Sequence, residues 1–140
     1  MPTRRQFVQK STTALAAGAA LSSLVTPAEA AKPEVLNYGF IHHVFFWLKN
    51  TNNAQDKAQL LQALKDLGKI DVIRAVHFGT ATKTKFDEKA TDDTYAVSVA
   101  LFFDNAKDEE TYLYHPLHKK FIDANKHLWG KVMVFDSLNA

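Results

Sequence analysis

The chain has 140 residues, no cysteine and a formal net charge of +2. This length suits one domain of ordinary size, and the lack of cysteine excludes disulfides, thiol nucleophiles and cysteine-bound metals. Residues 1–30 hold three basic side chains and one acidic one, so the remainder has 14 of each and is formally neutral. A neutral domain gives no reason to expect nucleic acid as a partner.

The first thirty residues have the three-part pattern of an export signal. Arg4 and Arg5 form a basic start, residues 12–25 are small and apolar, and Ala28-Glu29-Ala30 provides a small-residue end. The apolar run is too short and too rich in alanine and serine for a membrane span. The paired arginines resemble a twin-arginine signal, which predicts a periplasmic or extracellular protein without a stable membrane anchor after cleavage. The alternative is a disordered or amphipathic segment that happens to contain Arg-Arg.

The remaining chain predicts a short linker at 31–38 and a single domain at 39–138. Apolar periodicity and turn residues indicate elements in this order: strand 40–49, helix 54–67, strand 70–79, loop 80–93, strand 94–103, helical region 106–128 broken at Pro116, and strand 131–138. This is the βαββαβ order of the ferredoxin-like α+β fold, with an antiparallel four-stranded sheet and helices on one face.

The first strand is apolar on both of its faces. Side chains alternate along a strand, and the two sets are Ile41, His43, Phe45 and Trp47 against Phe40, His42, Val44, Phe46 and Leu48. Two helices can cover only one side of a four-stranded sheet, and the other side would expose a large apolar patch. We therefore expect a homodimer that packs sheet to sheet, and we place Val99 on its open face.

The stretch Tyr112-Leu113-Tyr114-His115-Pro116-Leu117-His118 interrupts the second helical region. A proline disfavours helical geometry at the residue before it and is well suited to the first position of a helix. One helix should therefore end near Tyr114 and another begin at Pro116. The break either forms a plain corner, with His115 and His118 satisfying backbone groups, or it directs His118 into a pocket.

These blocks, "HHVFFWLK", "YLYHPLHKKF" and "WGKVMVFDS", resemble the stress-responsive dimeric α/β-barrel (Dabb) family across almost the whole mature chain. The resemblance implies a ferredoxin-like protomer that pairs into a barrel. It also implies a distant likeness to olivetolic acid cyclase, a plant member that closes a polyketide chain. In that comparison His118 matches the general base, Tyr112 its tyrosine partner and His43 a pocket histidine. One cyclase histidine is replaced here by about Val97.

The resemblance and the residue types together give a set of candidate site residues. His118, Tyr112 and His43 are candidates for catalysis, and a ligand could contact His115, Phe121, Phe45, Trp47, Val97 and Trp129. A histidine in an apolar pocket can act as a base near neutral pH. A metal on His115, His118 and His43, with Asp136 as a further ligand, is the sharper alternative, but no carboxylate spacing completes such a set. We therefore expect neither metal nor cofactor.

Two functions fit this sequence. The first is an exported, dimeric stress-response protein that holds a small apolar or aromatic ligand without turnover. The second is a cofactor-free enzyme of the cyclase or monooxygenase type, in which His118 is the base. A connected cavity that touches His118 and Tyr112 favours the enzyme, whereas a filled interior favours simple binding.

Overall fold

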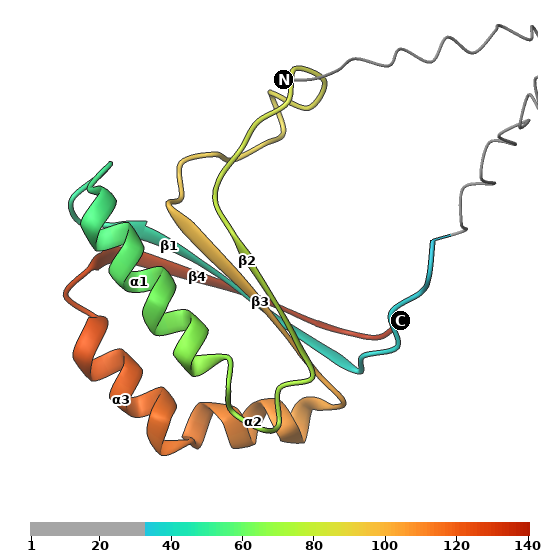
Figure 1. Cartoon of the computed structure of the whole chain (residues 1–140). Helices are drawn as coiled ribbons and strands as arrows, with labels where there is room; N and C mark the ends of the chain where they lie inside the picture. Colours follow the sequence, from blue (N-terminus) through green and yellow to red (C-terminus); the bar gives the residue numbers. More distant parts are fainter. Residues whose placement is uncertain (1–32) are drawn as a thin grey trace, which may run out of the picture. The chain divides into compact units, whose positions relative to one another are not determined.

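Residues 33–140 are described by a computed structural model, in which Val35–Ala140 forms one compact unit. Its elements are β1 (Phe40–Leu48), α1 (Ala54–Leu67), β2 (Ala75–Gly79), β3 (Val97–Phe103), α2 (Ala106–Tyr114), α3 (Pro116–Asn125) and β4 (Trp129–Leu138). The strands form one antiparallel sheet in the order β2-β3-β1-β4, and the helices lie on one side of it (Figure 1). The predicted ferredoxin-like α+β fold is confirmed. The predicted export signal at 1–30 lies outside the described residues.

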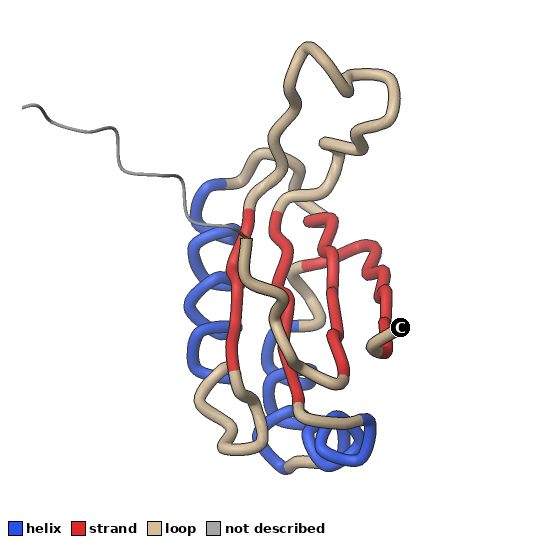
Figure 2. The backbone as a smooth tube through the Cα atoms, turned by 90° about the vertical axis from the view of Figure 1, so that its right-hand side faces the viewer, coloured by secondary structure: helices blue, strands red, loops and turns tan. Residues whose placement is uncertain are grey.

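The expected element boundaries need three corrections. The segment 70–74 is not part of β2, because local backbone bonds turn it: Ile70 N–H donates to Leu67 and Ile73 N–H donates to Ile70. Residues 94–96 precede β3, and β4 begins at Trp129, which pairs with Leu48. The long connection between β2 and β3 extends beyond the end of the sheet (Figure 2). Residues 80–95 of this connection contribute no buried residue to the core.

The core lies between the helices and one face of the sheet. β1 contributes Phe40, Val44 and Phe46, and the register with β3 places Val97, Val99, Leu101 and Phe103 on the same face, all nearly or fully buried. Leu60, Leu64 and Leu67 of α1 close this layer. The expectation that Val99 lies on the open face is therefore wrong, since its side chain is 2% exposed beneath the helices. A sequence with two apolar faces does not reveal which one the helices cover.

The opposite face of the sheet is apolar and aromatic as predicted. Phe45 of β1 packs edge-on against Phe135 of β4, with ring centroids 5.7 Å apart. Phe135 is 55% exposed and Met133 37%. In the described part of the chain no helix covers this face, because all three helices lie on the other side of the sheet (Figure 1). This face is referred to below as the open face.

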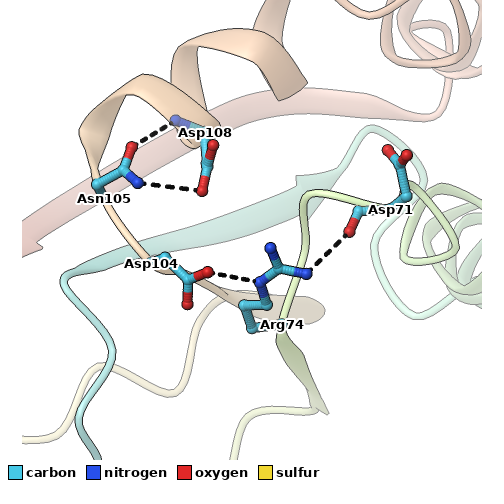
Figure 3. Close-up of polar contacts among 5 residues, drawn as sticks. All are labelled: Asp71, Arg74, Asp104, Asn105 and Asp108. Atoms are coloured by element: carbon cyan, nitrogen blue, oxygen red, sulfur yellow. Dashed lines mark hydrogen bonds and ion pairs between the residues drawn. The ribbon is translucent and has the colours of Figure 1, made fainter.

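The end of β3 connects to both β2 and α2 through a short polar cluster (Figure 3). Arg74 Nε–H donates to Asp104 Oδ2 at 2.8 Å, and the Arg74 backbone N–H donates to Phe102 O at 2.8 Å. The next residue, Asn105, caps α2 by accepting the Asp108 backbone N–H at 3.0 Å. The exposed ion pair adds little stability, while the cap fixes where α2 begins.

α2 and α3 are separated by the break predicted at Pro116. His115 has an extended backbone, with φ −62° and ψ 137°, and Pro116 occupies the first turn of α3. Within residues 33–140, no helix is both long enough and apolar enough to cross a membrane. In the same region α1 and α2 contact the sheet, and α3 contacts α1 and α2.

The buried position of Val99 generates a stability prediction. Val99→Glu places an unpaired carboxylate beneath the helices, so we expect it to lower the free energy of unfolding by more than about 4 kcal/mol. Val76→Glu, at a valine on β2 that is 38% exposed, is the matched control and should change stability little. Urea unfolding followed by circular dichroism measures both. Equal stability of the two variants would contradict the register of β3.

Candidate functional site

A cavity of about 320 Å³ lies between the helix-facing side of the sheet and helices α2 and α3. Its polar lining consists of His42, Tyr112, His118 and Lys126. The remaining lining is apolar: Val44, Phe46, Leu64, Leu67, Val99, Leu113, Phe121, Ile122, Trp129, Val132 and Val134. Volume and composition match sites for small organic ligands, which are mostly apolar with a few placed polar groups.

The helix break determines how His118 is held. In a continuous helix the Leu117 N–H would bond to the Leu113 carbonyl, four residues earlier. Here the Leu117 N–H donates to His115 Nδ1 at 3.1 Å, and the Leu113 carbonyl instead accepts His118 Nδ1–H at 2.9 Å. Because a carbonyl can only accept, the proton sits on Nδ1, and Nε2 is the basic nitrogen of the neutral ring.

Burial in the cavity wall favours the neutral form of His118. Desolvation lowers the pKa of its imidazole, the bond to the Leu113 carbonyl offsets part of this effect, and nearby His42 lowers the pKa further. The ring packs against Tyr112 with centroids 4.6 Å apart and stacks with Phe121 at 6.5 Å. The nitrogen of His118 thus bonds to the backbone of Leu113, whereas its contact with Tyr112 is through the rings.

Tyr112 lies on the buried side of α2, with 3% of its surface exposed. Its ring contacts His42 edge-on at 5.9 Å, so it lies in contact with both cavity histidines. Burial raises the pKa of the Tyr112 phenol, and the neighbouring Glu109 raises it further. The hydroxyl therefore remains protonated and can act as a hydrogen-bond donor to a ligand.

His42 occupies the cavity, whereas His43 does not. The period-two alternation of β1 turns His42 toward the helices and His43 toward the open face. The expectation that His43 shares a cavity with His118 is therefore wrong. His43 stacks on Phe45 at 4.2 Å, and its Nε2 is buried without a hydrogen-bond partner among the described residues. Burial lowers the pKa of His43, as do His77 and His42 to a lesser extent.

His42 forms part of a polar group that the sequence did not reveal. His42 Nδ1–H donates to Asp136 Oδ1 at 2.7 Å, and Glu109 Oε1 lies 3.6 Å from the same nitrogen. These residues come from β1, β4 and α2, so only the folded chain brings them together. The available signal was Asp136, a carboxylate that follows the apolar run 132–135 and alternates onto the face of Val132 and Val134.

The other candidate residues lie in different parts of the structure: the cavity, the cap of α3, the core and the open face. Phe121 and Trp129 line the cavity and stack with centroids 5.8 Å apart. His115 caps α3, Val97 is fully buried in the core, and neither lines the cavity. Phe45 and Trp47 line a smaller depression of about 170 Å³ on the open face. The metal set of His115, His118 and His43 is not brought together.

Comparison with solved structures returns the same fold at low sequence identity. A hydroxynitrile lyase from Passiflora edulis is 17% identical, with 75% of this chain and 96% of that chain aligned and a TM-score of 0.62. A Dabb family protein with a ferredoxin-like fold from Mesorhizobium loti is 22% identical over 73% and 98%, with a TM-score of 0.59. A protein from Thermobifida fusca described as a dimeric ferredoxin-like protein of unknown function is 17% identical over 77% and 97%, with a TM-score of 0.58.

No match to a curated protein was found. The model of the stress responsive A/B barrel domain, Dabb, matches residues 40–139, which include β1, β4 and all the cavity residues described above. Because this match covers most of the chain, the protein belongs to the stress responsive A/B barrel (Dabb) domain family.

Proposed function

We propose that this protein binds a small, mainly apolar or aromatic molecule in the cavity and that His118 acts on it as a general base. The observation that supports the proposal is the fixed imidazole: its Nδ1 is engaged by the Leu113 carbonyl inside a mostly apolar cavity. A neutral histidine with a defined basic nitrogen can remove a proton from a hydroxyl or from a carbon next to a carbonyl. Tyr112 could donate a hydrogen bond to the oxygen on which charge develops.

Retention of a ligand without turnover is the second candidate. The aromatic wall of Phe46, Phe121 and Trp129 supports it, because flat ligands bind well against such surfaces. Open space beside His118 and Tyr112 favours turnover, since a molecule bound there would lie next to both polar groups. That one protein of this fold is a hydroxynitrile lyase shows that the fold can carry an enzyme. Val97 in place of a cyclase histidine disfavours the polyketide cyclisation itself.

We also propose that the protein works as a homodimer joined through the open face. Phe135 and Met133 are exposed there beside Phe45 and Trp47, and an apolar patch of this kind usually meets a partner. Proteins with the same fold are described as dimeric. A second copy would also shield His43, whose Nε2 is buried without a partner among residues 33–140.

Export completes the proposal. Arg4, Arg5 and Ala28-Glu29-Ala30 support a twin-arginine signal at residues 1–30, which would deliver the domain to the periplasm or the exterior already folded.

If His118 is a neutral base in the cavity, its pKa should lie below 6.5, the ordinary value for histidine. Because the folded pKa is lowered, the unfolded chain takes up the proton first as the pH falls, so His118 should reduce stability progressively below about pH 6.5. Unfolding experiments between pH 7.5 and 5.5 should show a smaller loss for His118→Asn than for the unmutated chain. NMR titration of the ring measures the pKa directly, and a value at or above 6.5 would contradict the geometry.

Ligand binding is tested with a panel of aromatic and polyketide-like compounds read by thermal shift. Val134→Trp should fill the cavity and abolish the shift, whereas Val76→Trp, on the other edge strand and outside the cavity, should leave it unchanged. For a compound that turns over, His118→Ala should retain binding and slow the reaction by a factor of about 10² or more. Equal shifts in both tryptophan variants would refute the cavity as the binding site.

Assembly is tested by light scattering. The unmutated protein should be a dimer, and Phe135→Glu on the open face should give a folded monomer because the charge resists burial. Tyr114→Glu, at an aromatic residue that is 68% exposed on α2, is the control and should remain dimeric. A well-folded monomer of the unmutated chain would rule out the proposal.

Export is tested by replacing Arg4 and Arg5 with lysine in the full chain. Loss of periplasmic protein, with unprocessed chain kept in the cytoplasm, is the expected result. Unchanged processing and periplasmic yield would remove the twin-arginine assignment.

A further inference from the structure

Three potential metal ligands converge beside the cavity, and one of them, His42, also lines it. His42 Nδ1 lies 2.7 Å from Asp136 Oδ1 and 3.6 Å from Glu109 Oε1. One ligand atom from each residue lies within 4.8 Å of the other two. Because β1, β4 and α2 each supply one residue, the group is held by the core of the fold and not by a loop.

Glu109 is the unusual member of this cluster. Its side chain is 90% buried, and its ion-pair partner, His42 Nδ1, lies at 3.6 Å, which is too far for a hydrogen bond. Burial raises the pKa of Glu109; the electrostatic effect of His42 opposes this, and the charge of Asp136 adds to it. Among residues 33–140, no lysine or arginine forms an ion pair with Glu109 or Asp136. A largely buried carboxylate that accepts no hydrogen bond is costly to ionise, and a metal cation beside it would lower that cost.

We propose that His42, Glu109 and Asp136 bind one divalent transition-metal ion. Metal–ligand bonds of about 2.0–2.2 Å separate neighbouring tetrahedral ligands by about 3.3 Å. The 3.6 Å spacing of His42 and Glu109 is close to this value. Asp136 would have to withdraw by about half an ångström from His42, and its side chain, 45% exposed, has room to do so. The metal would replace the proton that His42 Nδ1 shares with Asp136.

The ligand types select among metals. Magnesium and calcium prefer oxygen ligands, whereas an imidazole nitrogen with two carboxylates suits zinc and its neighbours in the first row. Three protein ligands leave a fourth position, as in catalytic zinc sites. Since His42 lines the cavity, an oxygen atom of a bound molecule could occupy that position. The proposal does not rest on the role of His118, because metal binding is measured without an organic ligand.

The test is calorimetric titration of zinc chloride into the tag-free, EDTA-treated protein. We expect one saturable site per chain. Glu109→Gln and Asp136→Asn should each weaken binding by at least about tenfold, because each removes a direct ligand. Glu110→Gln, at the adjacent exposed glutamate of α2, is the matched control and should bind as the unmutated chain does. Magnesium chloride should give no saturable binding under the same conditions.

Two results would overturn the proposal. One is the absence of stoichiometric zinc binding by the unmutated protein. The other is unchanged zinc affinity in both Glu109→Gln and Asp136→Asn, which would place the ion on other histidines. Glu109→Gln removes a buried charge and Asp136 is partly exposed, so both variants should fold, as circular dichroism can verify. Should one of them unfold, the other still decides the question.

Discussion

The structure depends on β1, the strand that is hydrogen-bonded along its length to β3 on one side and to β4 on the other. Its side chains supply both the core beneath the helices and the aromatic open face. Because successive residues point to opposite faces, a register shift of one residue would exchange the positions of His42 and His43. It would also move the core side chains of β1 to the open face. The same alternation that buries the core therefore also determines which histidine enters the cavity.

The general order of the fold could be predicted from sequence because it depends on local signals. Alternating apolar residues, the caps at Asn53 and Asn105, and Pro116 each act within a few positions of the chain. The face of each strand could not be predicted in the same way, since both faces of β1 and β3 are apolar. Val99 was therefore placed on the wrong face and His43 in the wrong cavity. The link between Glu109, His42 and Asp136 required the three-dimensional register.

The cavity and the polar group beside it combine side chains that lower the stability of the fold with others that raise it. Phe121, Trp129 and Phe46 gain from burial, whereas His42 and Glu109 lose hydration without forming a full set of strong hydrogen bonds. Apolar residues of similar size would give a more stable domain. Such local costs are typical of functional sites, where the rest of the fold compensates for them. The break between α2 and α3 is a smaller local cost of this kind. The helical hydrogen bond from Leu117 N–H to the Leu113 carbonyl is lost, and the carbonyl fixes the imidazole of His118 instead.

One wall of the cavity belongs to β4, which lies at the edge of the sheet and pairs only with β1 among the described strands. Val132 and Val134 face the cavity from this strand and remain nearly half exposed. Edge strands open more readily than central ones, so their amide hydrogens exchange sooner with solvent. A bound molecule would therefore slow amide exchange most in β4, the strand that forms this wall of the cavity.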